Sequence, residues 1–455
     1  MTSRRRIATV AATLVIAAAA GSGPATTGGA DPASPSAASV DDTVRLNEVQ
    51  VVGTHNSYKQ MVSPPEEELL RSAIGDEADA LAYEHEALPV QFQSQKVRQI
   101  ELDVFLDDSG GLFAEPLLRA AAGVGPYDPR MDDPGIKVLH VQDVDYASSC
   151  LTLVECLTAV QQWSDANPSH MPITILVELK DSELDFGDFP FVVPEPWTEA
   201  AMDTLDAEIR SVMGPDDIIA PDDVRGSRPT LEEAVLADGW PTLGESRGKV
   251  LFAMDNEGGY RDRYLAGAPT LENRALFTNS TPGQPDAAFV KQNDATQEAQ
   301  IQSLVADGYL VRTRADADTV EARENDTSTR DAALRSGAQF VSTDYPVPGI
   351  AFGFTTDYVA EIPGGTVARC NPVNAPPGCL SADIDTIFTP VAPPERPTEP
   401  PVEPPDGPPP GEGTDGPPAP DPQPGTGPAD DSPPATEADT ATGAQPVAGR
   451  PTLTG

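Results

Sequence analysis

The chain is predicted to fold as an α/β protein, a TIM (β/α)8-type barrel with insertions at its mouth and a disordered Pro-rich C-terminal tail. Two observations predict this. Short runs rich in Val, Ile and Leu alternate with amphipathic helical patterns over residues 44–387. Several runs also break into polar residues at their C-terminal ends, where a parallel barrel builds its mouth and its active site.

Eight runs are the candidate strands, each bounded by turn-forming or polar residues. In chain order they are VQVVGTHNSY (49–58), VRQIELDVFL (97–106), IKVLHVQDVDY (136–146), ITILVELKD (173–181), KVLFAMD (249–255), RALFT (274–278), GYLVRTR (308–314) and AQFVSTDY (338–345). Helical patterns occupy 151–166, 197–213, 296–308 and 328–337. Residues 60–95 and 106–135 are interpreted as loops inserted at the mouth. A doubly wound sheet is disfavoured because GTHNSY, and not a Gly-rich phosphate turn, follows the first strand.

The two ends of the chain differ in composition from the barrel region. Residues 1–30 contain three arginines, then IATVAATLVIAAAA, then small residues, which is the order of a secretory signal peptide. The apolar stretch is shorter than the roughly 20 residues that a membrane helix needs. Residues 31–43 are expected to be a disordered leader. Residues 388–455 are rich in Pro, Gly and acidic residues, so they are expected to stay disordered. We therefore expect a secreted, extracellular protein.

Charge and cysteine usage narrow the class of partner. Acidic residues number 72 against 29 basic ones, a net charge of −43. Nucleic acid is excluded as a partner, because binding it depends on neutralising phosphates with Lys and Arg. The four cysteines form two pairs close in sequence, and in an exported protein Cys150–Cys156 and Cys370–Cys379 are the simplest of three possible disulfide pairings. Zinc is disfavoured because neither pair has C-x-x-C spacing.

Chemically active residues gather at the ends of the first four runs. They are His55, Asn56, Glu101, Asp103, His140 and Glu178. Carboxylate and amide oxygens suit Ca²⁺ or Mg²⁺, and histidines beside such a cation supply acid–base chemistry near neutral pH. Together these residues predict a metal-assisted phosphoryl-transfer site.

Alternation along the strands supports this grouping. Glu101 and Asp103 are two residues apart, so their side chains point to one face, where two carboxylates are unfavourable without a cation or proton between them. The alternative is a solvated strand end, but the apolar flanks of this pair favour ligands. Lys180 lies on the same face as Glu178, where it can bind phosphate or pair with an acid. Arg314 can bind the substrate headgroup or brace the barrel through an aspartate. His85 and His170 lie in polar loop contexts and are interpreted as structural.

Four segments carry a resemblance to a known family. GTHNSY, ELDVF, VLHVQDVDYASSC and ILVELKD resemble the bacterial calcium-dependent phosphatidylinositol-specific phospholipase C family, within the phospholipase C-like phosphodiesterase TIM-barrel superfamily. The resemblance covers roughly 44–350 and is strongest in 49–58, 97–105 and 138–181. Each segment alone is weak evidence for the family, whereas the four segments together, in this order and spacing, are specific evidence.

By position, the resemblance implies Ca²⁺ bound by Asn56, Glu101, Asp103 and Glu178, with His55 and His140 as the catalytic pair. It implies attack of the inositol 2-hydroxyl on phosphorus, releasing diacylglycerol and a cyclic inositol phosphate. His140 is assigned to the leaving group and His55 to the transition state or the attacking proton, while Glu101 is an alternative proton acceptor.

Two other functions stay open. A glycerophosphodiester phosphodiesterase is also similar, although its motif pairs the first histidine with Arg where this chain has Asn56. The other alternative is a non-catalytic exported barrel that binds lipid headgroups. We expect a monomer acting on a phospholipid or small phosphodiester, with transient membrane-surface contact.

Overall fold

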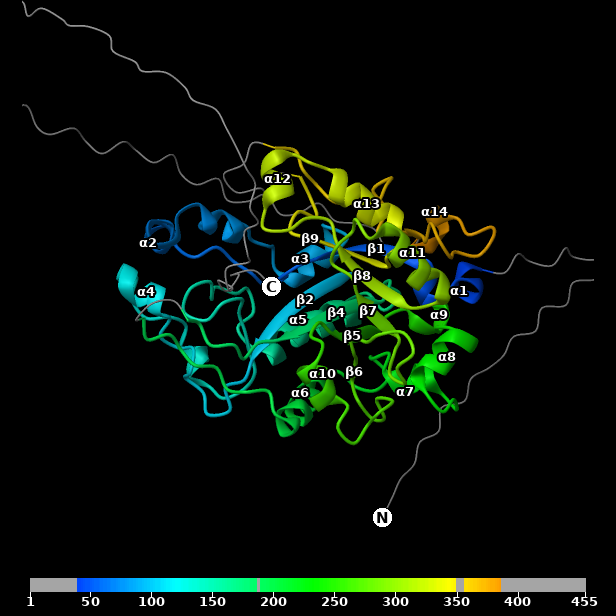
Figure 1. Ribbon diagram of the computed structural model, residues 1–455, viewed down its shortest axis with the longest axis horizontal. Helices are drawn as coiled ribbons and strands as arrows, with labels where there is room; N and C mark the ends of the chain where they lie inside the picture. Colours follow the sequence, from blue (N-terminus) through cyan, green and yellow to red (C-terminus); the bar gives the residue numbers. More distant parts are fainter. Residues whose placement is uncertain (1–38, 186–188, 349–355, 386–455) are drawn as a thin grey trace, which may run out of the picture. The chain divides into compact units, whose positions relative to one another are not determined.

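A computed structural model describes residues 39–185, 189–348 and 356–385. Within these ranges, eight parallel strands form a nearly closed barrel in the order β6-β5-β4-β2-β1-β9-β8-β7 (Figure 1). A single parallel bridge, Asn279 to Phe289, joins β6 to β7 and completes the ring. The predicted TIM-barrel fold is confirmed.

The barrel strands are short and almost wholly buried, as expected for parallel strands covered by helices. They are β1 (Val49–Thr54), β2 (Gln99–Phe105), β4 (Ile173–Leu179), β5 (Val250–Met254), β6 (Leu276–Phe277), β7 (Phe289–Lys291), β8 (Leu310–Arg314) and β9 (Phe340–Thr343). Two further strands pair antiparallel with the barrel: β3 (Lys137–Val138) with β2 and β10 (Ala368–Cys370) with β1.

Helices follow most of the barrel strands and bury their apolar sides against the sheet. The α-helices are α1 (Val40–Thr43), α2 (Pro64–Ile74), α3 (Leu88–Gln93), α4 (Leu117–Ala122), α5 (Leu153–Ala166), α6 (Glu199–Val212), α7 (Pro221–Arg225), α8 (Leu231–Ala237), α9 (Leu243–Ser246), α10 (Gly259–Tyr264), α11 (Glu298–Asp307), α12 (Val320–Glu324), α13 (Ser328–Ser336) and α14 (Ser381–Ile384). The 3-10 turns are η1 (Leu46–Glu48), η2 (Gly75–Leu81) and η3 (Pro129–Asp132). All four predicted helices are confirmed, as α5, α6, α11 and α13.

The longest of these helices show why the chain folds this way. Thr152 caps α5 by accepting the backbone N–H of Glu155, and Thr198 caps α6 in the same manner. Such caps contribute about 1 kcal/mol each. One face of α5, including Leu157 and Val160, is fully buried in the main apolar core, which also holds the buried strand side chains.

Three predictions about the strands were wrong. The run 136–146 is not a parallel barrel strand, because two of its residues form β3 and the rest crosses the mouth as turns and isolated bridges. The three-residue β7, the sixth strand of the barrel in chain order, was missed, whereas β8 is the seventh barrel strand as predicted. β10 was missed as well. The predicted mouth insertions are not plain loops, since 60–95 contains α2, η2 and α3, and 106–135 contains α4 and η3.

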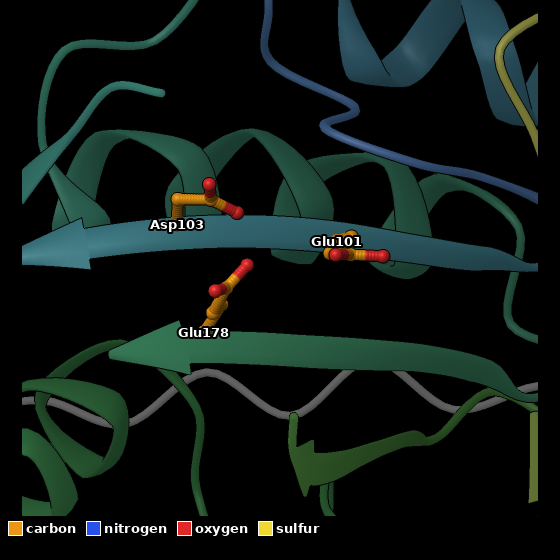
Figure 2. Close-up of side chains that lie close together, drawn as sticks. All are labelled: Glu101, Asp103 and Glu178. Carbon is orange, nitrogen blue, oxygen red and sulfur yellow. The ribbon is translucent and has the colours of Figure 1, made fainter. Parts of the chain in front are cut away.

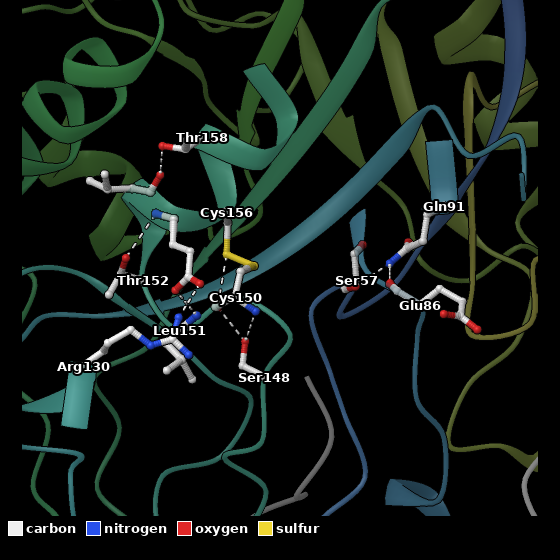
Figure 3. The surroundings of a disulfide bond; sticks show 12 residues. Ser57, Glu86, Gln91, Arg130, Ser148, Cys150, Leu151, Thr152, Cys156 and Thr158 are labelled. Carbon is white, nitrogen blue, oxygen red and sulfur yellow. Dashed lines mark hydrogen bonds and ion pairs between the residues drawn. A yellow bond between two sulfur atoms is a disulfide. The ribbon is translucent and has the colours of Figure 1, made fainter. Parts of the chain in front are cut away.

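Both predicted disulfides are present. Cys150–Cys156 joins the loop after β3 to the first turns of α5, next to the Thr152 cap and to Ser148, whose hydroxyl contacts the backbone of Cys150 (Figure 3). Closing so short a loop contributes about 2 kcal/mol in the chain-entropy description. Cys370–Cys379 joins β10 to the turn before α14.

The predicted signal peptide (1–30), most of the leader and the whole of the predicted tail (388–455) lie outside the described residues. Residues 40–43, expected to belong to the leader, instead form α1, which contacts α9 and α14. Among the described residues, no helix combines the length and apolar character needed to cross a membrane.

Candidate active site

His55 and Asn56 follow β1 directly. Gly53 precedes them where β1 meets β2, and a Cβ there would lie 2.0 Å from the side chain of Gln99, so the close approach requires glycine. Asn56 has φ 43°, in the left-handed region that Asn tolerates better than most residues. Nδ1 of His55 lies 2.9 Å from Oδ1 of Asp344, which follows β9. Because Nδ1 of His55 is held by Asp344, Nε2 is the ring nitrogen that faces the mouth.

Three carboxylates gather on two neighbouring strands. Glu101 and Asp103 project from β2 and Glu178 from β4, and Figure 2 shows the three side chains beside one another. In the register of this strand pair, Asp103 lies opposite Glu178. One oxygen from each of the three carboxylates lies within 4.8 Å of the others. The predicted acidic cluster is thus assembled by strand register alone.

These residues fit a divalent cation. Among the described residues, Oδ1 of Asp103 and Oδ1 of Asn56 are buried without a hydrogen-bond partner, which normally costs about 1–3 kcal/mol for each group, and Oδ2 of Asp103 has an ion pair with Lys180. Burial raises the pKa of Glu101 to about 7, although Arg312, 2.6 Å from Oε2, opposes this. Burial also raises the pKa of Asp103 well above its usual value. These oxygen atoms have too little positive charge around them, and a bound calcium ion would supply it.

Lys180 already places a positive charge on this cluster. Its Nζ lies 2.9 Å from Oε1 of Glu178 and 3.2 Å from Oδ2 of Asp103. Burial opposes its charge, but these two carboxylates hold the pKa of Lys180 above its usual value. Of the two roles predicted for Lys180, the structure shows the pairing with acids, and its ammonium acts as a stand-in for a cation.

His140 is in the mouth, although it does not end a barrel strand as predicted. It follows β3, and its Nδ1 lies 2.8 Å from Oδ2 of Asp145 on the same loop. The other oxygen of Asp145 lies 3.3 Å from Nζ of Lys59. Burial by itself raises the pKa of Asp145, but Lys59 and the hydrogen bond from His140 hold it below its usual value. Nδ1 of His140 therefore contacts a charged carboxylate.

The two histidines line one small cleft. Its lining is made by His55, Ala80, Tyr83, His140, Arg314, Asp318 and Asp344. Arg314 lies 3.6 Å from Oδ2 of Asp344 and 3.4 Å from each ring nitrogen of His55. Burial, followed by Arg314 and Arg312, lowers the pKa of His55 well below its usual value. Burial likewise lowers the pKa of His140, although Asp145 opposes this. Burial thus favours the neutral form of both imidazoles, whereas Asp145 favours the imidazolium form of His140.

A comparison with known protein families identifies the family of this chain. A family model described as "Phosphoinositide phospholipase C, Ca2+-dependent" matches residues 44–372. The chain belongs to this family. Its members are phosphodiesterases, so the chain is identified as an enzyme of the phospholipase C type, and the calcium dependence of the family agrees with the acidic cluster at Glu101, Asp103 and Glu178.

Solved structures of similar proteins include two bacterial enzymes. The calcium-dependent phosphoinositol-specific phospholipase C from a Gram-negative Pseudomonas species is 16% identical, with 73% of this chain and 96% of that chain covered and a TM-score of 0.43. The calcium-dependent phosphatidylinositol-specific phospholipase C from Streptomyces antibioticus is 19% identical, with 67% and 96% covered and a TM-score of 0.41. Identities this low give no residue-by-residue correspondence. No curated protein matches the chain by sequence.

Several residues of this phospholipase C-type site were not predicted. Lys59 and Tyr83 depend on how the insertion between β1 and β2 folds back: Nζ of Lys59 donates to the carbonyls of Leu81 and Tyr83, and Asn56 Nδ2 donates to the Tyr83 hydroxyl at 2.9 Å. Asp145 could have been predicted from the sequence, because it is an acidic residue only five positions after His140.

The remaining two histidines, His85 and His170, interpreted from the sequence as structural, are buried and contact backbone carbonyls. Nε2 of His85 lies 2.8 Å from the backbone carbonyl of His55. His170 contacts Ser164 and the carbonyl of Met171.

Proposed function

We propose that this enzyme cleaves phosphatidylinositol to diacylglycerol and a cyclic inositol phosphate, with Ca²⁺ held by the oxygens of Asn56, Glu101, Asp103 and Glu178. The observation that supports this most directly is the pair of histidines beside the carboxylate cluster, each with an aspartate on its Nδ1. When bound, Ca²⁺ supplies positive charge that favours ionisation of the attacking hydroxyl and offsets charge on the phosphate oxygens.

The aspartates fix how each imidazole meets the substrate. A histidine that donates Nδ1–H to a carboxylate directs Nε2 to the reacting groups, where Nε2 accepts a proton in the neutral ring and donates one in the imidazolium form. The proton of the inositol 2-hydroxyl must leave as the new O–P bond forms, and the glycerol oxygen must gain a proton as its bond to phosphorus breaks. One group that accepts a proton and one that donates it are therefore sufficient.

The surroundings of the two histidines support a division of these roles. The charged Asp145 stabilises the imidazolium form of His140, so we assign His140 as the acid that protonates the glycerol oxygen. The Arg314 guanidinium, 3.4 Å from both ring nitrogens of His55, disfavours a second positive charge there. His55 is therefore assigned to the attacking hydroxyl, as hydrogen-bond acceptor or base, and Arg314 to the phosphate.

We infer that the mouth also touches the membrane that contains the substrate. The segment after β4 exposes Phe189 (59%) and Val193 (58%). It is tied to the loop that carries His140, since the backbone N–H of Val192 donates to Asp143 at 2.6 Å. We further infer that the protein acts outside the cell, where its two disulfides are stable.

The reaction can be tested directly on vesicles. Phosphatidylinositol vesicles are incubated with enzyme, with Ca²⁺ or with chelator, and the product is identified by ³¹P NMR. We expect a five-membered cyclic phosphate with Ca²⁺ and none with chelator. Product from a glycerophosphodiester but not from phosphatidylinositol would favour the alternative enzyme, and absence of product from both would rule out the proposed reaction. His140→Ala should abolish turnover while sparing Ca²⁺ binding.

A further inference from the structure

Lys59 lies where three segments of the mouth meet, and no step of the proposed reaction uses it. It belongs to the loop after β1, where its backbone N–H donates to the carbonyl of Asn56 at 2.8 Å. An isolated antiparallel bridge pairs Lys59 with Ser148, in the loop that carries His140. The carbonyl of Lys59 accepts the backbone N–H of His85, in the insertion between β1 and β2, at 3.0 Å. The backbone at Lys59 therefore joins these three segments.

The ammonium of Lys59 is fully buried, and its donors are all in use. Nζ donates to the carbonyls of Leu81 and Tyr83 at 2.8 and 2.9 Å, and it lies 3.3 Å from Oδ1 of Asp145. An ammonium has three N–H donors, so these acceptors account for each of them. The side chain of Lys59 thus fixes where Asp145 lies relative to the folded insertion.

A positive charge at this position is explained by Asp145. A neutral donor would satisfy the carbonyls of Leu81 and Tyr83, whereas a buried carboxylate needs a charged partner. Lysine is almost never buried completely unless it is paired with an acid. Nζ of Lys59 also lies 4.5 Å from the centroid of the Tyr83 ring, but a cation over an aromatic ring gains less than an ion pair in a dry site. The ion pair is therefore the feature that requires lysine.

Asp145 has a different partner on each of its oxygens. Oδ2 lies 2.8 Å from Nδ1 of His140, and Oδ1 faces Lys59. Burial lowers the pKa of His140, and Asp145 opposes this. The positive charges of Lys180 and Lys59 lower it. Lys59 therefore offsets part of the charge that Asp145 places on His140, so that the imidazolium can form and still release its proton.

We propose that Lys59 is a positioning residue for protonation of the leaving group, which it serves by holding Asp145 in place behind His140. This inference rests on the proposed function, in which His140 is the acid. As the bond from phosphorus to the glycerol oxygen breaks, that oxygen takes the proton from Nε2 of His140, which leaves an alcohol and a neutral imidazole. The importance of Lys59 should therefore grow with the leaving oxygen's need for a proton.

Two soluble diesters with different leaving groups test this dependence. Both are esters of myo-inositol 1-phosphate, one with an alkyl alcohol and one with p-nitrophenol, whose anion is stable and leaves without a proton. Lys59→Met should lower kcat for the alkyl ester about 10- to 100-fold, the usual effect of losing a group that orients a histidine. On the aryl ester the loss should be less than about threefold, because protonation adds little there.

A double-mutant cycle tests whether Lys59 acts through Asp145. Asp145→Asn should show the same dependence on the leaving group. The double variant Lys59→Met, Asp145→Asn should lose no more than about twofold beyond Asp145→Asn alone, because residues that act as one unit are not additive. The double variant lacks both buried charges, so it avoids the unpaired charge of either single variant. It therefore measures the role of Lys59 even if Lys59→Met does not fold.

Lys137→Met is the matched control. Lys137 is also fully buried, its Nζ lies 3.2 Å from an oxygen of Asp107, and it donates to the carbonyls of Asp133 and Gly135. Its surroundings thus resemble those of Lys59, but Asp107 does not contact a histidine in the described structure. We expect Lys137→Met to lower Tm and to leave the ratio of kcat for the two esters unchanged.

Each other outcome counts against the inference. Equal losses on both esters in Lys59→Met would show that Lys59 only braces the mouth, and a shifted half-saturating Ca²⁺ concentration would place the damage at Asn56. Additive losses in the double variant would show that Lys59 acts independently of Asp145. An unchanged kcat on the alkyl ester would remove Lys59 from the reaction while the proposed function stands. If the wild-type enzyme cleaves neither ester and no phosphatidylinositol, the proposed function fails and this inference fails with it.

Discussion

Nδ1 of His55 and Oδ1 of Asp344 lie 2.9 Å apart although 289 residues separate them. The contact joins the loop after β1 to the loop after β9, two strands that pair in parallel. It fixes which ring nitrogen of His55 is available to a substrate. The same arrangement recurs at His140 and Asp145, five residues apart in one loop.

Asp344→Asn should lower kcat about 10²- to 10³-fold with little change in KM, because an amide cannot hold the same His55 tautomer and the contribution of a positioned acid–base group is of this size. Steady-state kinetics on phosphatidylinositol measures kcat and KM separately. Asp206→Asn is the matched control, since this buried acid bonds to Tyr264 and Arg274 outside the site. A kcat within twofold of wild type would show that Asp344 does not position His55.

Lys180→Met should lower the half-saturating Ca²⁺ concentration about fivefold, the equivalent of about 1 kcal/mol. The reason is that its ammonium now pairs with Glu178 and Asp103, two of the proposed ligands. Calorimetric Ca²⁺ titration gives the affinity without turnover. Lys96→Met, whose ammonium donates to the Gly365 carbonyl, serves as control. Unchanged or weaker Ca²⁺ binding would contradict competition between Lys180 and the ion.

The double variant Phe189→Ser, Val193→Ser should lose at least about tenfold in activity on phosphatidylinositol vesicles and keep full activity on a soluble diester. Each exposed apolar side chain contributes about 1–2 kcal/mol when buried in lipid. Leu380→Ser is a matched control, because this residue is 60% exposed but lies beside α14. Equal losses on both substrates would point to damage within the site and not to lost membrane contact.

Stability should fall as the solution is acidified, in part through His170. Burial lowers the pKa of His170 to about 4, whereas its unfolded value is about 6.5. The unfolded state therefore binds the proton first, so stability is full above pH 6.5 and is lost as pH falls from there towards 4. Between pH 7 and 5 this group costs about 2 kcal/mol. Urea unfolding of wild type and His170→Gln at both pH values should show a smaller loss in the variant; parallel losses would exclude His170.

The parts of the site that were predictable from sequence are those that depend on strand periodicity. Glu101, Asp103 and Glu178 lie in buried strands, where alternation and register decide which side chains meet. His140 was expected in the mouth for a wrong reason, since its run is mostly loop. Apolar content alone does not distinguish a barrel strand from a segment that crosses the mouth and buries Leu139 and Val141.

Other features had no local signal. β7 has three residues, too few for a periodic pattern, so its Lys291 was not recognised as part of the mouth. Lys59 and Tyr83 reach the site through contacts with η2 and the residues after it, which form only when the first insertion packs over the barrel. Such tertiary contacts are decided by packing and not by the residues nearest in sequence.

The pairing of β10 with the start of β1 places α14 against α1, so both ends of the described chain lie on the face opposite the mouth. In the membrane contact proposed above, where the mouth touches the lipid, this face points to bulk solvent. A fluorescent domain, an affinity tag or a surface linker joined directly at Ser39 or at Asp385 would therefore start on the side away from the mouth. A tether joined at Ser39 or Asp385 would leave the mouth accessible to substrate.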